Sequence, residues 1–189
     1  MDQPRRGEAG ATTEMTTDAF LDAWAEDSKE YKPGDQAVEA EALGAVLQEV
    51  KDMTGSKSIY MTHSQGGAVG WDTDMENVAA IVAIEPGGTP EAGSDQYNKL
   101  LEANVPIVIY FGDYIDNGPE DIMSTGFWKA VRDGALQFME SYNADGGDCT
   151  VVDLPKEGIT GNSHFMFQEM NNKEIAEHIE NWLAERGLN

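Results

Sequence analysis

The sequence is poor in cations, has a single cysteine and has no long apolar run. Its 189 residues include 12 Lys and Arg against 35 Asp and Glu, which leaves a formal charge of −23. Binding to a nucleic-acid backbone or to an anionic membrane surface needs clustered cations, so the charge argues against both kinds of partner. The lone Cys149 excludes an internal disulfide and a metal site built from several cysteines. No run approaches the ~18 apolar residues of a membrane span.

The first thirty residues also lack the apolar core of a secretory signal peptide. We therefore expect a cytoplasmic protein; the alternative is an exported protein whose leader is missing from this sequence. No G-x-G-x-x-G motif and no phosphate-loop lysine follows a predicted strand, so we expect neither a nucleotide cofactor nor a metal. Hydrophobic residues make up 40% of the chain, which is enough for a sizeable core despite the acidic charge.

Short apolar runs alternate with helical patterns along most of the chain. The apolar runs cover residues 58–62, 78–84, 105–111 and 149–154, and the helical patterns cover residues 35–53, 94–103, 121–142 and 172–186. Continuous apolar runs are typical of strands buried on both faces of a parallel sheet. Strands that alternate with helices predict an α/β fold with right-handed crossovers. We predict one α/β domain over residues 1–189: an irregular segment (1–34) with a short helix near 20–24, then a core (35–189) of four identifiable strands and flanking helices.

The first predicted strand runs into THSQGG, residues 62–67. A serine between a strand and a helix, followed two positions later by glycine, is the pattern of a nucleophile elbow. The chain passes close to itself around such a turn, so small side chains are needed two residues before and after Ser64. Gly66 meets this requirement, whereas Thr62 stands where glycine is usual. The turn would expose the Ser64 hydroxyl, and the N–H of Gln65 would face a developing oxyanion.

A serine nucleophile needs a base, and the chain has three histidines. His63 neighbours Ser64 on a strand and should point to the opposite face, where packing is its expected role. His178 lies within a helical pattern among glutamates and should be solvated. His164 lies in GNSHF, residues 161–165, between the last strand and the last helix. A base can reach the carboxyl ends of the strands from there, so His164 is the candidate.

Three carboxylates could orient that base. Glu85 directly follows the second strand, and Asp113 and Asp116 follow the third. The acid must orient the imidazole and stabilise its cation, and either strand end would serve. The residues alone leave this choice open.

Three segments in chain order resemble those of bacterial α/β-hydrolase-fold serine esterases. They are THSQGG (62–67), AIEPG (83–87) and GNSHF (161–165). The chain is similar in particular to a subgroup whose triad acid is a glutamate after the strand that follows the elbow. The resemblance spans essentially the whole chain. It implies that Ser64 is the nucleophile, His164 the base and Glu85 the acid, with Asp113 as an alternative acid or a polar residue of the site wall.

The resemblance also implies a sheet shortened at its N-terminal side. Such esterases have a larger sheet and an upstream loop, often rich in glycine, that supplies one oxyanion N–H. No equivalent segment precedes residue 62, so the N–H of Gln65 is the one oxyanion donor that can be identified. The first strand would then lie at an exposed sheet edge, which favours a homo-oligomer.

We therefore expect a serine hydrolase that cleaves a small-molecule carboxylic ester through an acyl-enzyme on Ser64. Tyr114 and Phe165 neighbour the predicted site and are the candidates for its substrate pocket. The alternative is a catalytically weak or silent hydrolase remnant that acts as an interaction or oligomerising domain.

Overall fold

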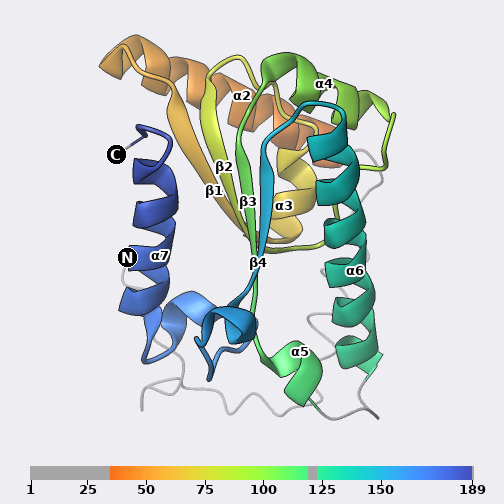
Figure 1. Ribbon diagram of the computed structural model, residues 1–189. Helices are drawn as coiled ribbons and strands as arrows, with labels where there is room; N and C mark the ends of the chain where they lie inside the picture. The colour runs from red at the N-terminus through yellow and green to blue at the C-terminus, as the bar shows by residue number, and fades with distance from the viewer. Residues whose placement is uncertain (1–34, 119–122, 189) are drawn as a thin grey trace, which may run out of the picture. The chain divides into compact units, whose positions relative to one another are not determined.

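The computed structural model describes residues 35–118 and 123–188, and four strands within them form one parallel sheet. In their order across the sheet they are β1 (Ser58–Ser64), β2 (Val78–Pro86), β3 (Ile107–Phe111) and β4 (Cys149–Asp153) (Figure 1). The predicted α/β class and parallel sheet are confirmed. The irregular segment predicted for residues 1–34, with its short helix, lies outside the described residues.

The helices of the described residues alternate with these strands. They are α2 (Asp35–Thr54), α3 (Gln65–Gly70), α4 (Asp95–Ala103), α5 (Tyr114–Asn117), α6 (Met123–Ala144) and α7 (Asn172–Ala184), with 3-10 turns at η1 (Leu154–Glu157) and η2 (Met166–Gln168). The ends of α2, α4, α6 and α7 differ from the predicted ends by at most two residues. The short α5 was not predicted, because four residues show no helical period. No described helix combines the length and the apolar character that a bilayer crossing requires.

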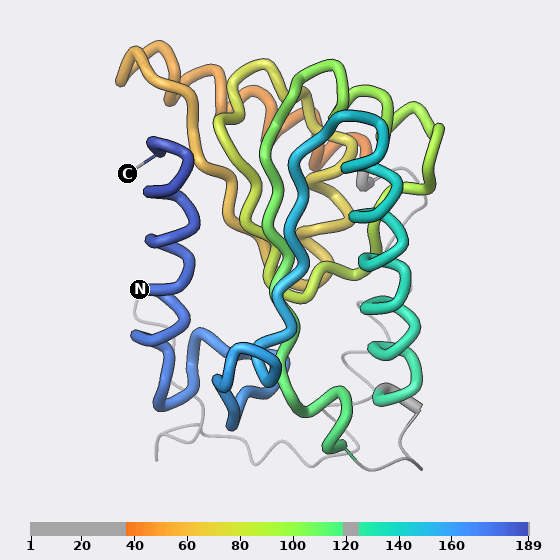
Figure 2. The backbone as a smooth tube through the Cα atoms, in the orientation of Figure 1, coloured from red at the N-terminus to blue at the C-terminus, as the bar shows by residue number. Residues whose placement is uncertain are grey.

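The two faces of the sheet bury different residues, because successive side chains of a strand point to opposite sides. On the face of α2, α4 and α6, the buried residues of β2 and β3 are Val78, Ile81, Ala83, Ile107, Ile109 and Phe111. On the face of α7, visible at one side of the sheet in Figure 2, the buried residues of the same two strands are Ala80, Val82, Ile84, Val108 and Tyr110. The central strands β2 and β3 are thus buried on both faces, as predicted. Two apolar layers hold the sheet rigid and fix the positions of its strand ends.

β1 is less buried than its apolar run alone predicts, and it lies at an edge of the described sheet, as the shortened sheet implied. Among the described residues it pairs only with β2, and Ile59 and Met61 are 38% and 54% exposed. Their register partners are Ala80 and Val82, so both side chains lie on the face of α7. They line an apolar groove together with Phe167, Ile175, Ile179 and Leu183. The strand is less buried than predicted because no other described strand lies beyond it.

Candidate active site

Ser64 occupies a sharp turn between the end of β1 and the start of α3. Its backbone angles are φ 55° and ψ −123°, in a region that a residue with a side chain adopts only where its surroundings enforce it. The flanking positions face each other, since a Cβ at Gly66 would lie 2.9 Å from Oγ1 of Thr62. Thr62 is therefore accommodated because position 66 has no side chain. This geometry matches a nucleophile elbow.

The elbow is held against the end of β2. The N–H of Gly87 donates to the carbonyl of Ser64 over 2.8 Å. A Cβ at Gly67 would lie 2.9 Å from Cα of Pro86, so this close approach of α3 to β2 requires glycine. These contacts place the serine beside Glu85, the residue that precedes Pro86.

Glu85 is turned out of the regular pairing of β2. His63 pairs with Ile84 and Ser64 pairs with Pro86, so the register passes over Glu85. Its φ is 41°, again in the left-handed region. Irregularities of this kind re-aim a side chain at the end of a strand. The carboxylate is thereby directed into the protein, where it is 0% exposed.

The buried carboxylate of Glu85 has a hydrogen-bond partner at each oxygen. The N–H of Gly112 donates to Oε1 over 2.8 Å, and the hydroxyl of Tyr114 donates to Oε2 over 2.8 Å. Burial, together with the neighbouring carboxylate, raises the pKa of Tyr114, so its hydroxyl keeps its proton and stays a donor. Hydrogen bonds to the ionised form offset part of the cost of burying this charge.

His164 joins the serine to the glutamate. Its Nε2 lies 2.9 Å from Oγ of Ser64, and its Nδ1 lies 2.5 Å from Oε2 of Glu85. With Nδ1–H donating to the carboxylate, Nε2 is left as the acceptor for the serine hydroxyl. The fold thus brings together residues that are 100 and 79 positions apart in the chain.

The two alternative acids, Asp113 and Asp116, accept hydrogen bonds from groups other than the His164 imidazole. Asp113 accepts the backbone N–H of Gly161 at Oδ2 over 2.9 Å and that of Asn162 at Oδ1 over 2.6 Å. Asp116 forms a two-pronged ion pair with Arg132 at 2.7 and 2.8 Å, which lowers the pKa of the aspartate. Neither carboxylate is bonded to the His164 imidazole, because each is occupied by other donors.

The position of Asp113 gives it a testable role as an anchor for the loop that carries His164. Asp113→Asn replaces one acceptor oxygen by an N–H2 group that faces a backbone N–H. We expect kcat of a reaction that uses Ser64 and His164 to fall about tenfold or more, because a shift of about 1 Å at a catalytic group can cost about 10²-fold. The control is Asp148→Asn, which breaks an exposed ion pair with Arg186 and should leave kcat unchanged. Equal kcat values in both variants would contradict this role.

Aromatic rings lie around the imidazole of His164. The ring centroids of His63 and Trp128 are each 4.4 Å from it, and that of Phe165 is 5.2 Å away. Phe165, a candidate pocket residue, is 48% exposed beside the imidazole. Tyr114, the other candidate, has its hydroxyl on Glu85. The Trp128 contact could not be predicted, because a helical pattern identifies a buried face but not what it touches.

The third histidine is more enclosed than expected. His178 is half-buried on α7, and its Nδ1 lies 3.0 Å from the hydroxyl of Tyr110. The expectation of a solvated His178 is therefore wrong, because α7 turns this position towards the sheet. Its hydrogen-bond partner is Tyr110, which does not belong to the cluster of Ser64, His164 and Glu85.

The N–H of Gln65 remains the candidate oxyanion donor. Gln65 is the first residue of α3, directly after Ser64. The first N–H groups of a helix have no acceptor within the helix, so this one is left for other partners. It is a backbone group on the elbow itself, which fixes its direction relative to the serine hydroxyl.

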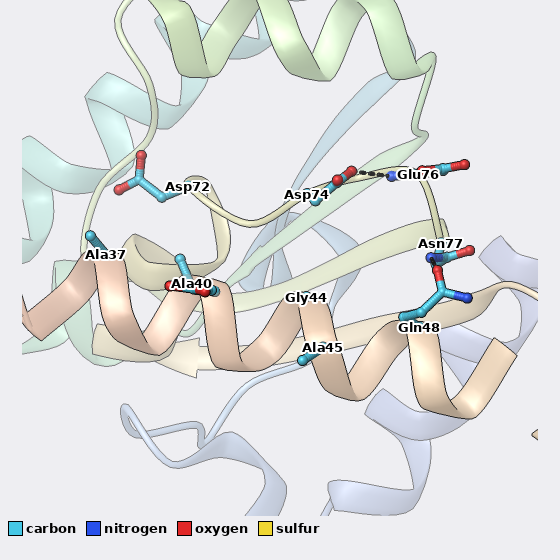
Figure 3. Close-up of a pocket in the computed structure, with 10 residues that line it drawn as sticks. Ala37, Ala40, Gly44, Ala45, Gln48, Asp72, Asp74, Glu76 and Asn77 are labelled. Carbon is cyan, nitrogen blue, oxygen red and sulfur yellow. Dashed lines mark hydrogen bonds between the residues drawn. The ribbon is translucent and has the colours of Figure 1, made fainter. Parts of the chain in front are cut away.

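A separate hollow of about 640 Å³ lies between α2 and the segment after α3 (Figure 3). Its lining includes Glu41, Asp72, Asp74 and Glu76, and it contains none of the three clustered residues. No group of three or more His, Cys, Asp or Glu side chains in the described part of the chain is arranged to hold a metal ion.

A serine on a strand-to-helix elbow, a histidine within its reach and a buried acid behind it are the features of a serine hydrolase with the α/β-hydrolase fold. The chain is similar to one protein described as a lipase and to one esterase of known structure. It is 25% identical over 218 residues to a protein of a fungal species (strain ATCC 74256) described as "Probable secreted lipase phiG". It also matches the solved structure of a bacterial esterase with a TM-score of 0.67 and 25% identity.

These matches are unequal in their coverage. They include 94% and 99% of this chain, but only 58% of the fungal protein and 55% of the esterase chain. The chain therefore spans little more than half the length of each relative. No protein-family model matches the sequence.

Proposed function

We propose that the protein hydrolyses carboxylic esters with Ser64 as nucleophile, His164 as base and Glu85 as acid. The observation that carries the proposal is the continuous hydrogen-bonded chain from Oγ of Ser64 through the imidazole to the buried carboxylate. Homology to esterases and lipases supports the same reaction class. The aromatic rings beside the imidazole favour an ester with an apolar group.

The reaction follows from the positions of these atoms. Oγ of Ser64 attacks the ester carbonyl while Nε2 of His164 takes the hydroxyl proton, and the N–H of Gln65 donates to the oxyanion. Nε2 then returns the proton to the leaving alcohol, and an acyl-enzyme forms on Ser64. Water, deprotonated by the same nitrogen, attacks the acyl carbon; the bond from that carbon to Oγ of Ser64 breaks, Nε2 returns the proton to Oγ, and the acid is released. Glu85 holds Nδ1–H and stabilises the imidazolium at each proton transfer.

A fluorophosphonate probe tests the proposal directly. Such probes phosphonylate an activated serine, so the folded protein should be labelled, and peptide mapping should find the adduct on Ser64. Ser163, which donates to Glu169 near the same site, provides an internal comparison and should stay unlabelled. Heat-denatured protein should not react, because its serine has no oriented base. Absence of labelling on folded protein would contradict the proposal.

The free edge of β1 favours a second candidate function. Seven strand residues there have no further strand beside them in the described part of the chain, and an apolar groove adjoins them. A silent hydrolase remnant that associates through this edge as a homo-oligomer would use these features. A stable oligomer by light scattering, combined with no labelling of Ser64, would favour this alternative; a labelled monomer would exclude it.

A further inference from the structure

His63 links the nucleophile to the base. It directly precedes Ser64 in β1, and its side chain lies on the face of α7, in register with Ile84. Its Nε2 lies 2.8 Å from the backbone carbonyl oxygen of His164. A carbonyl oxygen only accepts hydrogen bonds, so Nε2 of His63 carries the proton and donates it. The residue next to the nucleophile is thereby bonded to the main chain of the base.

The His63 ring is also confined by its neighbours. Its centroid lies 4.4 Å from that of His164, and 5.0 Å from those of Phe165 and Phe167. Three rings therefore restrict its rotation, which keeps Nε2 directed at the carbonyl oxygen. The donor is fixed in place before any substrate binds.

We infer that His63 is a positioning residue for ester hydrolysis: its Nε2–H holds the backbone of His164 so that the His164 imidazole stays within reach of the Ser64 hydroxyl. The inference rests on the proposed function, because it assigns a role within that reaction. His63 itself touches none of the reacting atoms.

The loop that carries His164 needs such a contact. Asp113 anchors it at Gly161 and Asn162, which precede the histidine, but makes no bond to His164 itself. Ser163, the residue before His164, also holds the loop by donating to Glu169. Within the described residues, the hydrogen bond from His63 is the one that reaches the backbone of His164 itself. It ties the loop at His164 directly to β1, the strand that ends in Ser64.

A neutral donor suits this position. Burial lowers the pKa of His63, and the charge of His164 lowers it further. The hydrogen bond to the His164 carbonyl and the charge of Glu85 act in the opposite direction. The two further rings beside His63, those of Phe165 and Phe167, are uncharged. A neutral ring avoids placing a second cation beside the His164 imidazolium that forms during the reaction.

Two variants distinguish the effect of the N–H donor of His63 from the effect of its aromatic ring. His63→Phe keeps an aromatic ring but has no N–H, whereas His63→Gln has an amide N–H at about the reach of Nε2 and no ring. We expect the Phe variant to lose about 10- to 100-fold in kcat on a p-nitrophenyl ester. KM should change by less than about threefold, since an effect on the transition state alone lowers kcat. The Gln variant should recover most of the loss.

A proton NMR spectrum provides a readout that does not depend on turnover. The short bond between Nδ1–H of His164 and Glu85 should give a low-field signal in the unaltered protein. We expect this signal to shift or broaden in His63→Phe and to return in His63→Gln, with both variants still folded by thermal melting.

The outcomes distinguish the positioning role from the proposed function. Unaltered kcat and an unaltered low-field signal in His63→Phe would overturn the inference. It would also be overturned if both variants lost activity only in proportion to their loss of folded protein. An unaltered protein that neither hydrolyses esters nor reacts with fluorophosphonate would refute the proposed function, and the NMR comparison would still decide whether His63 positions His164.

Discussion

Ser64→Ala should reduce kcat/KM for p-nitrophenyl ester hydrolysis by at least about 10³-fold and abolish fluorophosphonate labelling. The expected size follows from the loss of the proposed attacking atom, since no acyl-enzyme can form on alanine. The other groups of the site remain, so the variant should still bind substrate and retain only the hydrolysis that they support.

The melting temperature separates this chemical loss from a loss of structure. Alanine keeps the Cβ and the strained φ of 55° at this position, so Tm should stay within about 4 °C of the original value. Ser58→Ala, at the other end of the same strand, should retain full activity. If Ser64→Ala hydrolysed the ester as fast as Ser58→Ala, another nucleophile would have to be found.

Glu85→Gln should lower kcat by about 10³- to 10⁴-fold, because the amide favours the tautomer of His164 that carries its proton on Nε2 rather than on Nδ1. The carboxylate now accepts from Gly112, Tyr114 and His164 at its two oxygens. In glutamine one oxygen becomes N–H2, which cannot accept. If this group faces His164, the imidazole must accept at Nδ1, and Nε2 then carries a proton and cannot take one from Ser64.

The same substitution should also lower the free energy of unfolding, because a buried donor loses its acceptor at a cost of about 1–3 kcal/mol. Circular dichroism melting would measure this change, and fluorophosphonate reaction rates would measure the chemical change. Glu91→Gln alters an exposed carboxylate and is the matched control, with neither effect expected. Full activity in Glu85→Gln would reopen the choice of acid, with Asp113 and Asp116 tested in the same way.

The fold was largely predictable because its repeating pattern is strong. Runs of apolar residues define β2 and β3, where both faces are buried, and helical periods define α4, α6 and α7. An apolar run does not predict the burial of β1 correctly, because residues 58–62 have an apolar pattern similar to that of a central strand. Whether a strand has one neighbour or two depends on the rest of the sheet. Local sequence does not contain that information.

The candidate site was predictable in part for a similar reason. The elbow around Ser64 has a local signature, and His164 follows from its place between the last strand and helix. The choice of Glu85 over Asp113 could not be made from the residues alone, since both follow a strand at the same sheet edge. It depends on the irregular end of β2 and on the N–H of Gly112, which are tertiary features.

The non-glycine residues with positive φ in the described ranges are Ser64, Glu85 and Asn104. Asn104 caps the end of α4 in the left-handed conformation, and glycine there would relieve the backbone at no cost to the chemistry. Glycine would relieve the backbone equally at positions 64 and 85, but it would delete the proposed nucleophile and the proposed acid. Selection for thermal resistance alone would therefore favour loss of catalytic power at two of these three positions. A library designed to stabilise this protein should vary Asn104 and keep Ser64 and Glu85 constant.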